Sequence, residues 1–415
     1  MTWQDKLTKT VYKLESGFDR IHHKLRHGLR TRPLMIQPYL GYGNSEGVLL
    51  RARVLADKGI RPAREEDSLW DNFKNAVKRL ESSEYPGASV AVKVYAHGNV
   101  YSTQTSTDNE GFVYHWLAYN NCDVEQDTSL QQADEAPEGN LSANDTANIN
   151  TPSINNPSIN NPSINPTVEH VRIHYKLLSP ERPSPVQSEG YAILPRSEAT
   201  FGIISDVDDT VLQTGATSTL SMIKKVLFGN ARTRLPFVGA AAFYQALCGQ
   251  TNPIFYVSSS PWNLYDMLTD FFDINDIPAG PLMLRDWGIK PSELLPFGHK
   301  THKLDSITGI MEAYPDLPFV LIGDSGQEDP EIYTTLVSKY PSRIKAIYIR
   351  DVSSDTRDTE IAKLQEEVAK AGCPLRLVKD TLAAATHAAE LGLINQAEVE
   401  TVRERQSEDM NRPLM

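Results

Sequence analysis

The segment FGIISDVDDT, residues 201–210, crowds acidic side chains directly after a short apolar run. Phe201–Ile204 reads as a buried strand, and three acids and a threonine follow it within six positions: Asp206, Asp208, Asp209 and Thr210. Carboxylates at the end of an apolar strand repel one another and resist desolvation. A divalent cation among them would relieve the repulsion, and Mg²⁺ prefers such oxygen ligands.

Three further polar groups lie next to predicted strands or helices in the same half of the chain. They are Ser258–Ser260 after IFYV, Lys300 and Lys303 before LDSITGIMEAY, and Asp324 and Asp329 in DSGQEDPE after FVLIG. With the first segment they supply a nucleophilic carboxylate, a second acid, a hydroxyl, a cation and further carboxylates. A carboxylate can attack phosphorus, a neighbouring acid can protonate the leaving group, and Ser and Lys can hold phosphate oxygens. These residue types favour phosphoryl transfer.

The elements that would position these groups belong to an α/β pattern that begins near residue 199. Short apolar strands such as FGIIS, NPIFYVSSS, PLMLR, FVLIGD and IKAIYIRDV alternate with helical stretches. This alternation predicts a parallel sheet with helices on both faces. Ligands of such sheets bind outside the carboxyl ends of the strands, so the polar groups should converge there. We expect this domain to span residues 199–395, with a C-terminal tail at 396–415.

The region before it reads as a mostly β module, residues 34–198. SVAVKVYAHGNVYSTQTSTDNEGFVYHWL has strand patterns broken by HGN and DNEG turns. An acidic, polar stretch at about 123–166 ends in a five-residue repeat, PSINN PSINN PSINP, which lacks large apolar side chains. Such a composition predicts a disordered insertion. A linker between domains is the alternative interpretation.

Residues 1–33 are expected to contain an amphipathic helix. Leu7, Leu14 and Ile21 recur every seven positions, and the segment is rich in Lys and Arg. One interpretation is a helix packed on its own protein or on a partner helix. The other is a basic helix lying on an anionic membrane.

Composition limits the class of protein and its location. The net charge of −12 argues against general affinity for nucleic acid. The three cysteines form no paired pattern, which favours a reducing compartment. The sequence contains no run of about 18 apolar residues and no signal-peptide core at its N-terminus. We expect a cytoplasmic protein that can be peripheral at a membrane.

The motifs together resemble the haloacid dehalogenase superfamily of phosphatases, whose fold is a Rossmann-like parallel sheet. DVDDT matches its first motif, and the resemblance implies that Asp206 is the nucleophile, Asp208 the general acid and base, and Thr210 a support of the loop. The later motifs match at Ser258, at Lys303 with Lys300 as the alternative, and at Asp324 and Asp329 in GDSGQED. The family's cofactor is Mg²⁺. The resemblance places Asp206, Asp208, Asp324 and Asp329 around it.

The sequence segments around the motifs resemble one family within this superfamily, the actin-patch phosphatidate phosphatase family and its bacterial relatives. FYVSSSPWNLYDMLTDFF, PLMLRDWG and LPFVLIGDSGQEDPEIY carry this resemblance within roughly residues 200–350. It implies hydrolysis of phosphatidic acid to diacylglycerol and phosphate. Only 44 residues separate Ser258 from Lys303, too few for a large lid domain, so the site could accept a headgroup that stays in a bilayer.

The segment after the nucleophile, LQTGATSTLSMIKKVLFGNARTRLPF, reads as a flap that mixes cations with apolar residues. Such a flap could contact a membrane peripherally, although an ordinary surface helix and loop has the same composition. Two alternatives to a lipid phosphatase remain. One is a phosphatase for another phosphomonoester, either a protein or a small molecule, and the other is a binding module without chemistry.

Overall fold

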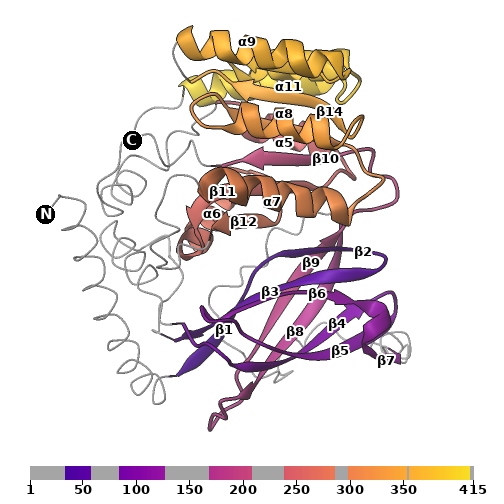
Figure 1. The fold of residues 1–415 in the computed structure, drawn as a ribbon, viewed down its shortest axis with the longest axis vertical. Coiled ribbons are helices and arrows are strands. Elements are labelled where there is room, and N and C mark those ends of the chain that lie inside the picture. The colour runs from indigo at the N-terminus through magenta and orange to yellow at the C-terminus, as the bar shows by residue number, and fades with distance from the viewer. Residues whose placement is uncertain are drawn as a thin grey trace, which may run out of the picture.

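The structure, a computed structural model, describes residues 33–57, 84–126, 168–207, 238–285, 298–352 and 355–411. The amphipathic helix expected within residues 1–33, the PSINN repeat and the flap fall on residues outside these ranges. The described residues form two sheets, one mostly antiparallel and one parallel, stacked one below the other in Figure 1. Among these residues, no helix combines the length and apolar composition needed to cross a bilayer.

The N-terminal sheet is built from nine described strands and confirms a largely β N-terminal region. The strands are β1 (Leu34–Pro38), β2 (Gly41–Asn44), β3 (Gly47–Ala56), β4 (Ser89–Ala96), β5 (Asn99–Ser106), β6 (Phe112–Ala118), β7 (Asp123–Gln126), β8 (Glu169–Ser179) and β9 (Gln187–Leu194). Their order is β1-β3-β2-β9-β8-β4-β5-β7, with β6 paired to β3. Alternate residues of β4 and β8 are buried, as expected for strands with one face on a core.

The C-terminal sheet is parallel, in the order β12-β11-β10-β13-β14-β15. Its strands are β10 (Gly202–Asp206), β11 (Ile254–Pro261), β12 (Leu282–Arg285), β13 (Phe319–Asp324), β14 (Ile344–Arg350) and β15 (Leu375–Val378). The helices of this half are α5 (Ala240–Cys248), α6 (Tyr265–Ile274), α7 (Gly298–Ala313), α8 (Asp329–Lys339), α9 (Asp355–Lys370), α10 (Thr381–Glu390) and α11 (Gln396–Asn411). These elements confirm the predicted α/β class with a parallel sheet.

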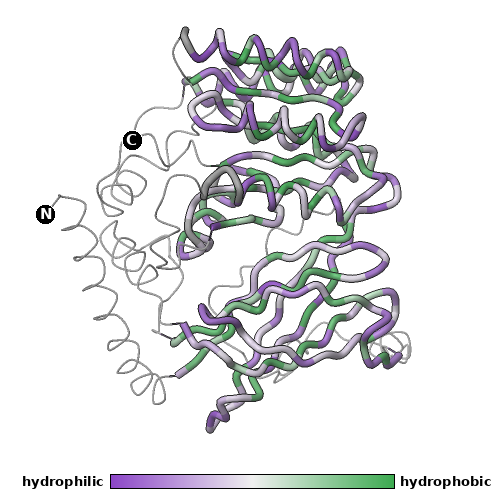
Figure 2. Tube along the Cα trace, viewed as in Figure 1, coloured by the Kyte–Doolittle hydropathy of each residue, from purple (hydrophilic) through white to green (hydrophobic). Residues whose placement is uncertain are grey.

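Helices cover both faces of the parallel sheet because its strands are apolar on both sides. One core contains side chains of α7, α8 and α9, and the other contains side chains of α5, α6, α10 and α11. The strands are mostly hydrophobic along their length, whereas α9 alternates between polar and apolar residues (Figure 2). This is the pattern expected when a strand is buried on two faces and a helix on one.

The central position of β10 decides where a ligand can bind. From β10 the chain adds β11 and β12 on one side, then crosses over to β13, β14 and β15 on the other. The strand order therefore reverses at β10, and the carboxyl end of β10 lies at the switch point where ligands of such sheets bind.

The two sheets share part of one hydrophobic core. Leu40, Tyr42 and Leu49 of the β module belong to the same buried cluster as strand residues of the parallel sheet. The Tyr42 ring meets the Phe255 ring edge-on with centroids 5.7 Å apart. The Tyr314 hydroxyl donates to the Gly43 carbonyl at 2.9 Å. The β module is therefore packed against the parallel-sheet unit across an apolar interface.

Residues 396–411, which the sequence analysis placed in a C-terminal tail, form helix α11. Val399 and Val402 are buried in the core on the α5 side of the parallel sheet. The Gly239 amide, just before α5, donates to Asp409 at 2.8 Å. The helix thus contributes to the packing of the α/β unit.

Replacing Val402 by alanine tests this contribution. Val402 has no exposed surface, so Val402→Ala should leave a small cavity and lower the free energy of unfolding by about 2 kcal/mol. Denaturant unfolding of this variant, compared with Glu404→Ala on the exposed side of α11, measures the effect. If both variants unfold like the parent protein, α11 does not stabilise the core.

Candidate active site

Asp206 ends strand β10 at the switch point of the parallel sheet. Asp206 is in register with Val257 of β11, so Ser258 follows one position further along the neighbouring strand. On the other side Ser205 is in register with Ile322 of β13, which ends two residues later at Asp324. The carboxyl ends of three adjacent strands therefore bring Asp206, Ser258 and Asp324 to one edge, as the sequence predicts.

Lys303 joins this edge from helix α7. Its Nζ lies 2.9 Å from Asp206 Oδ1 and 2.9 Å from Asp329 Oδ1. The Gln327 side-chain oxygen accepts a further hydrogen bond from Nζ at 3.2 Å. The side chains of Lys303 and Asp206 are 4% and 3% exposed, so this ion pair is screened little by water.

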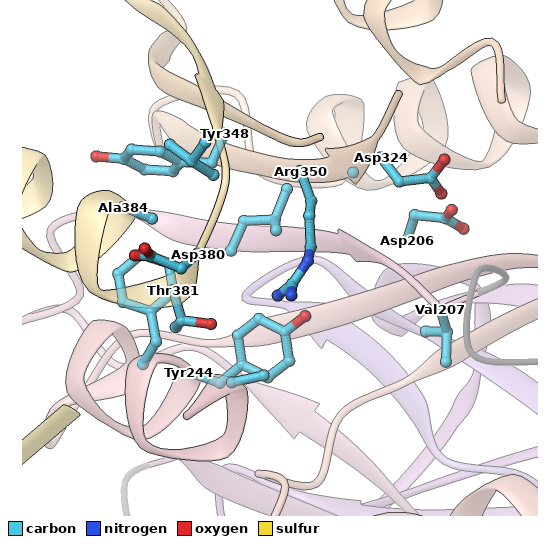
Figure 3. A pocket seen from close by; sticks show the side chains of 14 residues that line it. Asp206, Val207, Tyr244, Asp324, Tyr348, Arg350, Asp380, Thr381 and Ala384 are labelled. Atoms are coloured by element: carbon cyan, nitrogen blue, oxygen red, sulfur yellow. The ribbon is translucent and has the colours of Figure 1, made fainter. Parts of the chain in front are cut away.

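The three carboxylates of Asp206, Asp324 and Asp329 lie together but are engaged differently. Each offers an oxygen atom, and these atoms lie within 4.8 Å of one another. Asp329 contacts Lys303 through Oδ1 and accepts from the Asp324 amide through Oδ2 at 3.2 Å. Both carboxylate oxygens of Asp329 are thus used in contacts within the protein, one with α7 and one with the end of β13. Figure 3 shows the carboxylates of Asp206 and Asp324 side by side and pointing the same way.

The loop after β13 is shaped around Asp324. Asp324 Oδ1 accepts from the amides of Gly326 at 2.7 Å and Gln327 at 3.1 Å. These two backbone donors fix the carboxylate and stabilise its charge. The orientation of Asp324 is therefore set by its own loop.

Ser258 lies in an irregular part of β11. Val257 is in register with Met283 of β12, but the next pair is Pro261 with Arg285, so the three residues in between bulge out of the ladder. The Ser258 hydroxyl is buried and accepts from the Ser260 amide at 3.0 Å. We call residues 258–260 the serine bulge.

Gly323 permits the close approach of Asp329. A Cβ atom at position 323 would lie 2.5 Å from Asp329 Oδ2 and 2.8 Å from Asp329 Cβ. The second distance involves the stem of a buried side chain, which cannot rotate away. The glycine before Asp324 is thus required for Asp329 to reach Lys303.

The acid cluster also affects a neighbouring phenol. Burial, followed by the charges of Asp329, Asp206 and Asp324, raises the pKa of Tyr333 well above its ordinary value. The Tyr333 hydroxyl therefore stays protonated and donates to the Ile322 carbonyl at 2.9 Å. This bond anchors α8 to β13 below the site.

Arg357, on α9, is a site-supporting residue that the sequence analysis missed. Its guanidinium donates to the carbonyls of Ser325 and Gln327 and binds both carboxylate oxygens of Glu331, with N–O distances between 2.6 and 3.1 Å. The Glu331 carboxylate raises the pKa of Arg357, against the opposing effect of burial. Arg357 thus clamps the loop that carries Asp324. No local spacing reveals this role, because its partners in the Asp324 loop and on α8 lie 26–32 residues away.

A cavity of about 50 Å³ opens beside Asp206 and Asp324, on the α5 and α10 side of the sheet. Its walls are largely apolar, with Phe243 and Val378 among them, and Arg350 and Tyr244 add polar groups. Figure 3 shows the Arg350 guanidinium next to the Tyr244 ring and directed away from the two carboxylates. The Tyr244 hydroxyl lies 2.9 Å from Ser205 Oγ, and burial raises the pKa of Tyr244.

Four residues that the sequence analysis names are not placed by the structure. Asp208, Asp209 and Thr210 lie outside the described residues, as does the side chain of Lys300. The structure thus brings together Asp206, Ser258, Lys303, Asp324 and Asp329, with Lys303 in direct contact with two of the acids.

The residues at this edge lie within a segment that matches a known protein family. Residues 201–351 match the family described as Phosphatidate phosphatase APP1, catalytic domain. Phosphatidate phosphatase APP1 of Saccharomyces cerevisiae is 33% identical over 160 residues, which cover 38% of this chain and 27% of the yeast protein. An uncharacterized protein of Schizosaccharomyces pombe is 30% identical over 157 residues, 37% of this chain and 26% of that protein. The chain thus spans about a quarter of the length of these curated relatives.

Solved structures resemble the whole chain only weakly. The PilB minor pilin from Streptococcus sanguinis superposes with a TM-score of 0.23 at 8% identity, over 60% of this chain and 77% of the pilin. A β-glucuronidase from Parabacteroides merdae gives a TM-score of 0.24 at 10% identity, over 80% of this chain and 39% of that enzyme. Neither superposition carries an argument about fold or function.

Gly323→Ala tests the packing of the acid cluster. The new methyl group must displace Asp329, so the free energy of unfolding should fall by about 1–3 kcal/mol, the usual cost of overpacking. Gly309→Ala is the matched control. In helix α7 its Cβ would come no closer than 3.8 Å to the Tyr42 hydroxyl, and alanine there should stabilise by up to about 1 kcal/mol. Equal stability of the two variants in denaturant titrations would contradict the proposed crowding.

Proposed function

We propose that this protein is a Mg²⁺-dependent phosphatase of the haloacid dehalogenase type that hydrolyses phosphatidic acid to diacylglycerol and phosphate. The single observation that carries the proposal is the Lys303 ammonium held between Asp206 and Asp329 at the switch point of the parallel sheet. A buried cation beside a carboxylate nucleophile is suited to a dianionic phosphate. The match of residues 201–351 to a phosphatidate phosphatase catalytic domain supports the reaction class.

The acid cluster fits a magnesium ion by its donor set. Asp206 and Asp324 present carboxylates in close proximity, and oxygen ligands of this kind are those that Mg²⁺ prefers. Asp329 uses both oxygens within the protein, so it would position Lys303 and the Asp324 loop. Asp208 completes the proposed set through the motif resemblance. The bound ion would neutralise charge on the phosphate oxygens and hold the phosphate against Asp206.

The chemistry then follows from the side chains. A carboxylate oxygen of Asp206 forms a bond to phosphorus, and the ester P–O bond breaks. Asp208 gives its proton to the departing alkoxide. Water then attacks the aspartyl-phosphate, Asp208 takes the proton from that water, and phosphate leaves with Asp206 regenerated. Lys303 and Ser258 hold the phosphate oxygens while their charge redistributes.

The geometry also bears on how a lipid would bind. A cavity of about 50 Å³ next to Asp206 holds only a few atoms, since one water needs roughly 10–15 Å³ of such space. An acyl chain does not fit in it. The proposal is that a lipid substrate presents its phosphate to the site while its chains remain in the bilayer.

Such a substrate requires the enzyme to approach a membrane peripherally from the cytoplasm. The basic amphipathic segment at residues 1–33 and the flap after Asp206 are the sequence features that support this part of the proposal. A phosphatase for a soluble phosphomonoester is the second candidate, because the same phosphate-handling residues would serve it.

A substrate screen tests the function. Phosphate release is measured from phosphatidic acid vesicles and from soluble phosphomonoesters such as p-nitrophenyl phosphate, with Mg²⁺ and with a chelator. We expect release from the vesicles with Mg²⁺ and its loss on chelation. Asp206→Asn should lower turnover on the order of 10³-fold or more, because the amide is not a nucleophile.

The matched control is Asp305→Asn, the same replacement at an exposed position of α7, which should keep parental activity. Release from soluble esters but not from vesicles would reject the lipid substrate. No release from any phosphomonoester, or full activity of Asp206→Asn, would reject the phosphatase.

A further inference from the structure

The residues that follow the serine bulge are held by the β module, which lies outside the matched catalytic region. The segment Trp262–Tyr265 comes directly after Pro261, the residue at which β11 resumes its register with β12. Its side chains contact β3, the two residues between β1 and β2, and the Phe112 ring of β6. Figure 1 shows this part of the β module lying against the side of the parallel sheet that ends in β12.

Arg51 of β3 is the most deeply buried of these contacts. It is 1% exposed, donates to the Leu40 carbonyl at 2.8 Å and to the Leu282 carbonyl, and lies over the Trp262 ring at 4.8 Å from the centroid. No described carboxylate forms an ion pair with it. A buried cation held by carbonyls and a ring face is costly to leave unsatisfied, so it fixes the position of its partners. Two of those partners flank the serine bulge: Leu282 lies on the neighbouring strand β12, and Trp262 follows the end of β11.

Arg53, two positions further along the same face of β3, makes a parallel contact. Its Nη1 donates to Asn263 Oδ1 at 3.2 Å. Within the β module it pairs with Glu84 at 3.1 Å and lies 4.1 Å above the Phe112 ring. Arg53 is therefore rigidly held in the β module and reaches across to the turn after the bulge.

An aromatic cluster completes the contact. The Tyr39 ring lies 4.6 Å from both the Trp262 and the Tyr265 ring centroids. The Leu40 amide donates to the Tyr265 hydroxyl at 3.1 Å. Trp262, Asn263 and Tyr265 are thus each bound by a different group of the β module.

We propose that the β module is a positioning scaffold for the serine bulge, with Arg51 and Arg53 as its positioning residues. Ladder pairing with β12 stops at Val257 and resumes at Pro261, so the contacts at these two ends contribute to the path of the bulge. Val257 is fixed by pairing with β10, and the other end is fixed by the β module. Residues 201–351 alone would then lack a correctly shaped site for phosphate oxygens. This inference rests on the proposed function for the role of Ser258.

The test compares two arginines that both donate to main-chain carbonyls. Arg51→Met removes the donors and keeps an apolar stem. Arg343→Met is the matched control, because Arg343 binds the carbonyls of Met311, Tyr314 and Leu317 at the opposite, amino end of the sheet. Asn263→Ala is a milder second variant that leaves both β-module arginines in place, in case Arg51→Met does not fold.

Two measurements are made on the full chain. The first is hydrogen exchange of peptides that cover residues 254–264. The second is the kcat and KM for p-nitrophenyl phosphate, together with inhibition by inorganic phosphate. Arg51→Met and Asn263→Ala should speed exchange in these peptides and lower kcat/KM by roughly 10- to 100-fold, as a small misplacement of a binding group does. Inhibition by inorganic phosphate should weaken in parallel, and Arg343→Met should leave all three unchanged.

Each outcome bears on one of the two proposals. If the parent hydrolyses the ester but Arg51→Met and Asn263→Ala match Arg343→Met in exchange and kinetics, the positioning role is overturned and the function stands. If the parent hydrolyses no phosphomonoester, the proposed function fails. Hydrogen exchange alone then tests whether the β module positions the serine bulge. Faster exchange over residues 258–264 in the two variants supports this role, and unchanged exchange overturns it.

Discussion

The arrangement of the site depends on the buried contact of Lys303 with Asp206 and Asp329. One cation between two carboxylates brings together α7, the end of β10 and the start of α8, which lie far apart along the chain. Removing one member of such a buried group leaves an uncompensated charge, which is strongly destabilising. The surrounding features serve this contact. Gly323 leaves room for Asp329, the Tyr333 hydroxyl ties α8 to β13, and Arg357 holds the intervening loop.

The same contact explains why a cluster of acids can persist at the end of an apolar strand. Lys303 compensates part of the charge, and two backbone amides compensate part of the charge on Asp324. The remaining negative charge belongs to Asp206 and Asp324, whose carboxylates point the same way. A site with this residual charge is suited to a divalent cation, and a cation so held is suited to an anionic phosphate ester.

The sequence predicts much of this arrangement because the relevant signals are local. Asp206 follows an apolar run, Asp324 follows another, and parallel strands bring their carboxyl ends to one edge. The sequence does not separate Lys303 from Lys300, since both belong to the start of α7 and only a three-dimensional contact places Lys303 beside Asp206. Arg51 carries no local signal at all, because its partners in the parallel-sheet unit lie more than 200 residues away. A charged residue inside an apolar strand simply reads as an exception to the pattern.

Helix α11 illustrates a different limit. The segment QAEVETVRERQSEDMN, which the sequence analysis assigned to a C-terminal tail, is mostly polar, yet its two valines are buried against the core. Short apolar stripes of this kind fall below what periodicity can separate from chance. The sequence predicts that residues 34–198 are mostly β, but it does not predict which strands pair or which residues contact the parallel-sheet unit. The pairing of distant strands is fixed by packing across the interface.

The central claim is that Asp206 attacks phosphorus, and a single turnover in ¹⁸O-labelled water tests it most directly. Enzyme in excess over substrate is quenched after one cycle. The masses of the released phosphate and of the peptide that contains Asp206 are then measured by mass spectrometry to locate the label. If an aspartyl-phosphate forms and water attacks its phosphorus, the label appears in phosphate alone on the first turnover. A rapid quench before hydrolysis then yields phosphate bound to the Asp206 peptide. Label in phosphate with no phosphorylated Asp206 peptide at any quench time, in a protein that turns over, would contradict the claim.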